Sequence, residues 1–236
     1  MNDIHTHILP AVDDGSKSGE MSLEMIKRLS AEGVRKIVLT PHFYASRNSV
    51  DSFLRKRERS LNELREAIGS EKLDVELYVG AEVLFMDSLD KVEGFERMAI
   101  DGTKYMLLEM PFETWGGRTV DTVYRIISNG ITPIIAHFER YIPMKNMDKI
   151  YELKQLGCIL QMNAENFNSF LSRRKALKFF EDGTARLLGS DCHNLESRPP
   201  EIKFAYDAIA KKLGDGKVSE IISLGNKILE NANRII

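Results

Sequence analysis

The sequence predicts an α/β fold in which seven strand–helix units form a parallel barrel. Short apolar runs of β type alternate with longer segments of helical period along the whole chain. Several of the runs are apolar at successive positions, as in strands that are buried on both faces. Glycine follows four of the helical segments, where a left-handed cap favours it. Seven units without an interrupting linker favour a barrel somewhat smaller than the eight-unit form.

Each expected element can be placed on the chain. The strands are DIHTHIL (3–9), KIVLT (36–40), VELYVGAE (75–82), YMLLEM (105–110), TPIIAH (132–137), CILQMN (158–163) and ARLLGS (185–190). The helical patterns cover residues 18–32, 49–70, 117–129, 145–156, 168–182, 199–213 and 216–233. We expect one domain over residues 1–236, with long loops or insertions at 41–58 and 83–103. An open doubly wound sheet is the alternative, but no glycine-rich phosphate loop follows any strand.

Composition narrows the class of protein. The net charge is −2 and the charged residues are well mixed, so no surface for nucleic acid or for an anionic membrane is indicated. The first residues lack the features of a signal peptide, and no apolar run is long enough to cross a bilayer. Cys158 and Cys192 are too few for a disulfide framework. We therefore expect a soluble, cytoplasmic protein without membrane insertion; its oligomeric state stays open.

Metal-binding residue types recur at the carboxyl ends of the expected strands. In a parallel barrel these positions share one face, where the βα loops build the active site. We therefore expect side chains far apart in sequence to meet there. They are all five histidines, His5, His7, His42, His137 and His193, and the carboxylates Glu82, Glu109 and Asp191.

Two short motifs have the spacing of paired ligands. His5 and His7 are two residues apart on a strand, so both imidazoles can reach one metal. Asp191 and His193 repeat this geometry with ligand types that suit manganese, iron or zinc. Buried histidines often only satisfy backbone groups, but the further candidates at strand ends favour a metal site.

Other carboxylates have structural alternatives. Asp13–Asp14–Gly15 could be a turn that caps a helix, and within it we favour Asp14 over Asp13 as a ligand. Glu82 and Glu109 end apolar strands, where a buried carboxylate without a cation would be costly. Pairing of either glutamate with an arginine is the alternative.

Arginines follow two of the histidines. Arg140 and Arg198 are candidates for binding phosphate oxygens, because the planar guanidinium matches them in pairs. Arg47 is a weaker candidate, and surface salt bridges are the alternative for all three. Some aromatic residues could wall a pocket for an aromatic leaving group, although lone aromatics more often pack. These residues are Phe43, Trp115 and Tyr141.

Cys192 and Arg198 have the C-x5-R spacing of thiol-based tyrosine phosphatases. The intervening residues HNLES contain no glycine, which disfavours a tight loop of inward-pointing amides. Cys192 also lies between two expected ligands, so its side chain should point away from the metals. A thiol mechanism is therefore disfavoured.

Six segments together resemble a known family over nearly the whole chain. They are DIHTHILPAVDDGS, LTPHF, GAE, LLEMP, IIAHFERY and GSDCHN. They resemble the polymerase-and-histidinol-phosphatase (PHP) superfamily and, within it, the capsular-polysaccharide-type bacterial protein-tyrosine phosphatases. The opening motif and A-H-x-E-R-Y are fairly specific to that branch. Ala11 and Phe138 stand where relatives usually have glycine and proline, and neither carries chemistry.

The resemblance implies a distorted seven-stranded (β/α)7 TIM-like barrel of the PHP type, holding three divalent metals. Manganese is the first expectation, with iron or zinc as alternatives. The implied ligand sets are His5, His7, Glu82 and Asp191 for the first metal; Glu82, Glu109 and His137 for the second; and Asp14, His42 and His193 for the third. Arg140, with Arg198 as a second candidate, would bind phosphate.

The implied substrate is phosphotyrosine in the tail of a bacterial tyrosine autokinase that controls capsular or exopolysaccharide export. A hydroxide bridging two metals would attack phosphorus, while the third metal and arginine offset charge on the phosphoryl oxygens. Asp14 or a bound water could protonate the leaving group. A small-molecule phosphatase, such as one for histidinol phosphate, is the main alternative; a nuclease and a catalytically silent metal-binding scaffold are further ones.

Overall fold

The protein is described by a computed structural model that covers all residues, 1–236. Its strands are β1 (Asn2–Thr6), β2 (Lys36–Leu39), β3 (His42–Phe43), β4 (Glu76–Val79), β5 (Glu82–Leu84), β6 (Tyr105–Glu109), β7 (Thr132–Ile135), β8 (Ile159–Asn163) and β9 (Leu187–Gly189). The α-helices are α1 (Gly19–Ala31), α2 (Val50–Ile68), α3 (Gly117–Ser128), α4 (Met147–Gln155), α5 (Phe170–Glu181), α6 (Lys203–Leu213) and α7 (Asp215–Ile228). Four 3-10 helices, η1 (Leu89–Lys91), η2 (Phe95–Met98), η3 (Phe138–Met144) and η4 (Ala164–Phe167), lie in the connections.

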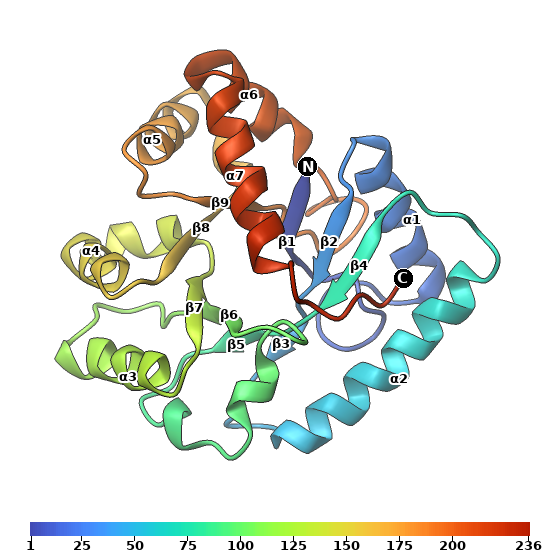
Figure 1. Ribbon diagram of the computed structural model, residues 1–236, viewed down its shortest axis with the longest axis horizontal. Helices are drawn as coiled ribbons and strands as arrows, with labels where there is room; N and C mark the ends of the chain where they lie inside the picture. Colours follow the sequence, from blue (N-terminus) through green and yellow to red (C-terminus); the bar gives the residue numbers. More distant parts are fainter.

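All paired strands are parallel and form a curled, half-barrel layer with the helices around its outside (Figure 1). The strand order is β1-β2-β4 in one sheet and β3-β5-β6-β7-β8-β9 in the other. A parallel bridge between Thr6 and Cys192 joins the end of β1 to the chain after β9. No helix is long and apolar enough to cross a membrane.

Every expected strand region appears in order, but the expected count of seven strands is not confirmed. Two regions are each divided into a pair of short strands, at Thr40–Pro41 and at Gly80–Ala81. Pro41 has no amide hydrogen to continue a ladder. At Gly80, an added Cβ would lie 3.2 Å from the side chain of Ile100, so the backbone approaches its neighbour closely there. Local breaks of this kind leave no periodic signal in the sequence.

The expected long loops are also shorter than the sequence suggested. Residues 41–58 contain β3 and the first turns of α2, which begins at Val50. The side chain of Ser49 caps α2 by accepting a hydrogen bond from Ser52 N at 3.3 Å. Residues 83–103 contain η1 and η2.

The interior of the curled sheet has an apolar level that α7 closes. Asn2 Nδ2, at the start of β1, donates to the carbonyl of Ile222 in α7 at 3.0 Å. Gly225 gives the room for this contact, because a Cβ there would lie 2.5 Å from Asn2 Nδ2. The apolar level consists of Ile4, Val38, Tyr78, Ile100, Leu107, Ile134, Ala136, Ile159, Leu187, Ile228 and Leu229.

A polar level lies above the apolar one, towards the carboxyl ends of the strands. Side chains two residues apart on a strand face the same side. Glu109 therefore follows Leu107, and Gln161 follows Ile159, on the inward face of its strand. The outward faces pack with the helices in a larger apolar cluster. The fold thus directs polar side chains to one end of its interior.

Four non-glycine residues have positive φ, which the L-configuration disfavours. They are Ala11 (φ 55°), His137 (φ 30°), Lys145 (φ 60°) and Asp191 (φ 55°). Two of them, His137 and Asp191, belong to the expected metal site. The left-handed conformation at Ala11 is one that glycine adopts without this cost.

Replacing Ala11 by glycine should stabilise the fold. A left-handed alanine costs roughly 1 kcal/mol, and the greater freedom of glycine in the unfolded chain offsets only part of this gain. We expect the Ala11→Gly free energy of unfolding to rise by about 0.5 kcal/mol in denaturant titrations at fixed metal concentration. Ala208→Gly, inside α6, is the matched control and should lose about 1 kcal/mol. A lower free energy of unfolding in Ala11→Gly would contradict the claim that the backbone is strained at Ala11.

Candidate metal centre

All nine expected metal ligands lie together at the carboxyl ends of the strands. They come from β1 and the loop after it, from β3, β5 and β6, and from the turns after β7 and β9. Nitrogen and oxygen donor atoms lie within 4.8 Å of one another in three groups, which overlap at His7, His42 and Glu82. The groups are His5, His7 and Glu82; His42, Glu82 and Glu109; and His7, Asp14, His42 and His193.

The tightest arrangement joins β1 to Glu82 and Asp191. The Nε2 atoms of His5 and His7 are 3.1 Å apart. Glu82 Oε2 lies 3.3 Å from the first and 3.2 Å from the second. Asp191 Oδ1 lies 3.4 Å from both. His5 and His7 therefore face the same point, between Glu82 and Asp191.

Asp13 orients the His7 imidazole from behind. Its Oδ2 atom lies 2.7 Å from His7 Nδ1 and also accepts the backbone amide of His42 at 2.9 Å. Its Oδ1 atom accepts the amide of Gly15 at 2.9 Å. Although burial opposes it, the contact with His7 lowers the pKa of Asp13. Asp13 is thus a charged acceptor that leaves His7 Nε2 directed at the centre.

Gln161 and Asn163 form the corresponding support for His5. Gln161 Oε1 lies 3.1 Å from His5 Nδ1 and accepts the amide of His137 at 2.9 Å. Gln161 Nε2 donates to Asn163 Oδ1 at 2.9 Å, and Asn163 Nδ2 donates to Asp191 Oδ2 at 2.7 Å. This chain of amides fixes both His5 and Asp191. Sequence reasoning missed it, although two polar residues at alternate positions of the apolar strand CILQMN were the available signal.

Two further histidines are held in the same way. His193 Nδ1 lies 2.9 Å from the backbone carbonyl of Asp191. His137 Nδ1 lies 3.2 Å from the hydroxyl of Tyr141, which accepts the amide of Met110 at 2.9 Å. With Nδ1 occupied, the Nε2 atom of each ring is left for the centre.

Glu82 and Glu109 lie between His137 and His42. His137 Nε2 lies 2.9 Å from Glu82 Oε1 and 3.7 Å from Glu109 Oε1. On the other side, His42 Nδ1 lies 3.0 Å from Glu82 Oε2 and 4.0 Å from Glu109 Oε2. The two oxygens of Glu82 therefore face different neighbours, as a bridging carboxylate would.

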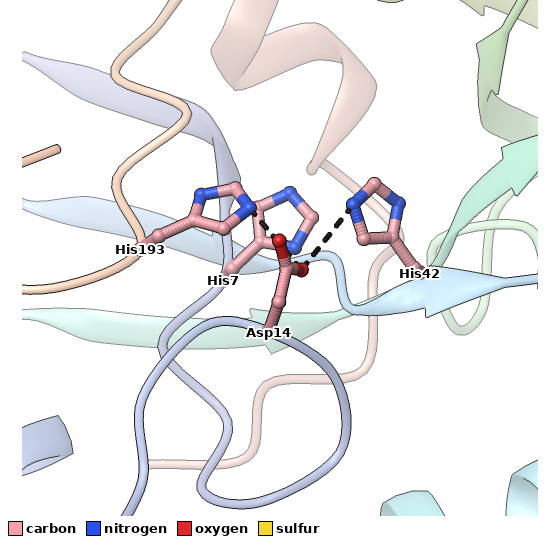
Figure 2. Close-up of side chains that lie close together, drawn as sticks. All are labelled: His7, Asp14, His42 and His193. Carbon is pink, nitrogen blue, oxygen red and sulfur yellow. Dashed lines mark ion pairs between the residues drawn. The ribbon is translucent and has the colours of Figure 1, made fainter.

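Asp14 completes the outer part of the centre (Figure 2). Its Oδ1 atom lies 3.6 Å from His42 Nε2 and 3.5 Å from His193 Nε2, with His7 beside them. The Asp14 side chain is 67 % exposed, whereas the other ligand candidates are buried or nearly so. Asp14 therefore marks the side on which the centre opens to solvent.

The carboxylates of the centre differ in their electrostatic environment. Burial alone would raise the pKa of Glu82 and Asp191, but neighbouring histidines hold both pKa values well below their usual range. Burial and the charge of Glu82 raise the pKa of Glu109 to about 7. Burial and the neighbouring His7 lower the pKa of His193 to about 4. The negative charge is thus concentrated where the imidazoles converge.

These residues fit divalent metal ions. His193 Nε2 is buried and has no hydrogen-bond partner, and His42 Nδ1 is buried 3.0 Å from Glu82 Oε2 without the geometry of a hydrogen bond. The Nδ1 atoms of His5 and His7 already have acceptors, and protons on both Nε2 atoms would have to share a 3.1 Å gap. Unprotonated nitrogens that face carboxylates suit a cation that accepts several lone pairs. The donor set is one that manganese, iron or zinc accepts.

Arg140 and Arg198 both reach the centre at Asp191. Arg140 Nη2 lies 3.0 Å from Asp191 Oδ2 and also 3.0 Å from Glu165 Oε1. Arg198 Nη2 lies 2.6 Å from the same Asp191 oxygen. Both side chains are about one-third exposed, so they are accessible from solvent. Arg47 forms no ion pair with Asp191, and its guanidinium carbon lies 5.0 Å from the ring centre of Tyr44.

The aromatic residues named from the sequence do not wall a substrate pocket. Phe43 and Tyr141 are 0 % exposed and Trp115 is 4 % exposed, so these residues pack in the interior, which is the alternative that the sequence favoured. Phe112 is instead exposed beside the centre, with its ring centre 6.3 Å from that of His137. The only sequence signal for Phe112 is its position three residues after the end of β6. The hydrophobic periodicity does not indicate that it is exposed.

Cys192 faces away from the centre, as expected. It is fully buried in the apolar cluster outside the strands, where burial raises the pKa of its thiol well above the usual range. The amides of His193 and Asn194 donate to the carbonyl of Arg198 at 2.9 and 3.2 Å. They are therefore not free to bind phosphate as a C-x5-R loop requires.

Comparison with known proteins places this centre in a family. A family model described as "Capsular polysaccharide synthesis, CpsB/CapC" matches residues 1–236. Tyrosine-protein phosphatase CpsB of Streptococcus pneumoniae is 34 % identical over 247 residues, which cover 100 % of this chain and 98 % of the relative. Putative tyrosine-protein phosphatase CapC of Staphylococcus aureus is 32 % identical over 238 residues, covering 98 % and 92 %.

A solved structure also matches over nearly the full length. It comes from work on YwqE from Bacillus subtilis and CpsB from Streptococcus pneumoniae, described as unique metal-dependent tyrosine phosphatases. The TM-score is 0.85 at 25 % identity, covering 99 % of this chain and 97 % of the other. Because the family model spans the whole chain and two relatives exceed 30 % identity, the protein belongs to the CpsB/CapC family of capsular polysaccharide synthesis.

Proposed function

We propose that the protein is a metal-dependent protein-tyrosine phosphatase. The observation that carries the proposal is the convergence of buried imidazoles and carboxylates next to two solvent-accessible arginines at Asp191. Such a centre can bind cations on one side and a phosphate dianion on the other. Its relatives CpsB, CapC and YwqE are named as tyrosine-protein phosphatases, which is consistent with this chemistry.

Three divalent ions, with manganese as the first candidate, are proposed as cofactors. His5, His7, Glu82 and Asp191 would hold one; Glu82, Glu109 and His137 another; and Asp14, His42 and His193 the third. The close groups also allow His7 to contribute to the third set and His42 to the second. Bound divalent ions supply Lewis acidity towards a phosphoryl oxygen and lower the pKa of a water nucleophile.

The residues of the chain itself position the phosphate. Arg140 and Arg198 would exchange their contact with Asp191 for oxygens of the substrate, where a charged fork offsets negative charge. The phenol that leaves has a pKa of ~10, so it needs little help from an acid. Asp14, exposed at the mouth, is the side chain proposed to hold a proton for it when required.

The proposed substrate is phosphotyrosine in the tail of a bacterial tyrosine kinase that acts in capsular or exopolysaccharide synthesis in the cytoplasm. A centre that opens to solvent at Asp14 and Arg198 suits an extended peptide. The family's connection with capsular polysaccharide synthesis supports this choice of substrate. We further propose that residues 1–236 act as one domain.

Ligand and supporting residues should respond differently to excess metal. His7→Ala, Glu82→Ala and Asp191→Ala should each lower phosphotyrosine-peptide turnover at least about a hundredfold, because each removes a donor. Asp13→Asn keeps His7 but weakens its orientation, so metal affinity should fall about ten- to hundredfold and saturating manganese should restore turnover. Metal content and kinetics across a manganese titration measure both effects. Near-normal turnover of a ligand variant at saturating metal would remove that residue from the centre.

Cys192→Ser should retain most activity, because the buried thiol only packs. A modest loss is expected, since a buried hydroxyl needs a partner that a thiol does not. A chelator should silence both wild type and variant, and manganese should restore both. If the folded, metal-loaded Cys192→Ser protein were inactive, the metal-dependent chemistry proposed here would be wrong.

Phosphotyrosine peptides should be hydrolysed much faster than phosphoserine peptides or histidinol phosphate. A phenol is a far better leaving group than an alkyl alcohol, so a site without a strong general acid favours it. Phosphate release from the three substrates at equal metal concentration measures the preference. A clear preference for histidinol phosphate would instead favour a small-molecule phosphatase.

A further inference from the structure

A second cavity opens beside the metal centre. Its volume is about 400 Å³, and Asp14 and His42 belong both to its wall and to the proposed metal ligands. The opposite wall is the first half of α2 and the loop before it. Because the cavity and the centre share side chains, a ligand bound at one extends directly towards the other.

Cations dominate the far wall of this cavity. Arg47, Lys56 and Arg59 line it, and none of them forms an ion pair with a carboxylate. The nearby acidic residues of α2 are engaged elsewhere: Asp51 pairs with Arg97 at 2.6 Å and Glu58 with Arg65 at 3.0 Å. These two acidic residues therefore already have partners on the surface, and the cavity cations are left for a ligand.

The carboxylates of the cavity do not neutralise these cations. Asp13 is held by His7 at 2.7 Å, and Asp14 faces His42 and His193. Both also line the cavity, but each already faces a histidine, so the three cations of the far wall outnumber the two carboxylates. A cleft with an excess of one sign of charge attracts a ligand of the opposite charge.

Tyr44 connects the two sites. Its ring stacks on the ring of His42 with centres 5.3 Å apart and an angle of 23° between planes. The guanidinium of Arg47 lies 5.0 Å from the ring centre of Tyr44. Tyr44 thus forms a continuous wall from a proposed metal ligand to the first cation of the cavity.

We infer that this cavity binds an anionic side chain of the substrate peptide, close in sequence to the phosphotyrosine that is hydrolysed. The inference rests on the proposed phosphatase function and adds a subsite to it. The ligand chemistry is a carboxylate or a second phosphotyrosine phosphate, because unpaired guanidinium and ammonium groups bind both. A neighbouring residue is the source, since an extended chain advances only about 3.3 Å per residue.

Arg59 is the best position for a test. Its side chain is exposed, lines the cavity and makes no hydrogen bond within the protein, so its replacement should not disturb the fold. Lys56 is less suitable, because its Nζ donates to the carbonyl of Val12 at 2.7 Å and holds the loop. Arg174, exposed on α5 at the opposite side of Figure 1, is the matched control for a change of charge.

The experiment compares three phosphotyrosine peptides with the manganese-loaded full chain. Their flanking residues carry glutamates, a second phosphotyrosine, or glutamines at the same positions; a small aryl phosphate reports the basal reaction. We expect the anionic peptides to have a kcat/KM about tenfold above that of the glutamine peptide, mainly through KM, and to lose this advantage at high salt. Arg59→Glu should abolish the advantage, and Arg174→Glu should preserve it.

Each outcome is decisive for the subsite. A preference for either anionic peptide that Arg59→Glu removes supports it, and the better of the two peptides identifies the source of the charge. Equal kcat/KM for all three peptides in the wild type, or the same loss in Arg59→Glu and Arg174→Glu, would overturn it. Failure of the proposed function is separate: the wild type would then hydrolyse neither the aryl phosphate nor any phosphotyrosine peptide.

Discussion

The molecule is organised around two imidazole nitrogens that are held 3.1 Å apart and face two carboxylates. This arrangement requires a cation. His5 and His7 cannot both place a proton in that gap while Glu82 and Asp191 approach from the other side. Lone pairs at this distance repel one another unless a cation lies between them. Asp13 Oδ2 and Gln161 Oε1 enforce the arrangement, because they accept hydrogen bonds from Nδ1 on the far side of each ring. The burial of the two histidines, the hydrogen bonds behind them and the carboxylates in front of them are therefore all consistent with a bound cation.

The arrangement of the centre also requires strained backbone conformations at two of its residues. His137 and Asp191 both have positive φ, and strained conformations of this kind cost about 1–3 kcal/mol each. The inward positions of β7 alternate through Ile134 and Ala136, so a regular strand would turn His137 outward. The left-handed turn at His137 instead directs its imidazole to Glu82. Packing of the apolar level below, closed by α7, holds the strand ends in place while this strain is maintained.

The sequence predicted the order of the strands and the convergence of the ligands because both follow from period-two alternation and from the geometry of parallel strands. It could not predict the breaks at Pro41 and Gly80, which depend on a neighbour as distant as Ile100. The supporting roles of Asp13, Gln161 and Asn163 were also missed, since an amide or carboxylate behind a ligand resembles any other polar residue. The role of Tyr141 was also not predicted, because its burial depends on packing and on its hydrogen bonds with His137 and Met110. Residue types at strand ends thus indicated the chemistry, whereas contacts across the fold determined how it is supported.

The side chains of the centre differ in their exposure to solvent, and their proposed roles differ accordingly. The buried residues proposed as ligands converge inside, while Asp14 and the two arginines meet solvent on the side proposed for the phosphorylated peptide. The most direct test of this account is a count of divalent ions bound per chain, by elemental analysis of chelator-stripped protein after titration with manganese. Three ions per chain, falling to two in His193→Ala, is the result that the three donor groups lead us to expect. Phosphotyrosine hydrolysis by protein that binds no divalent ion would contradict it.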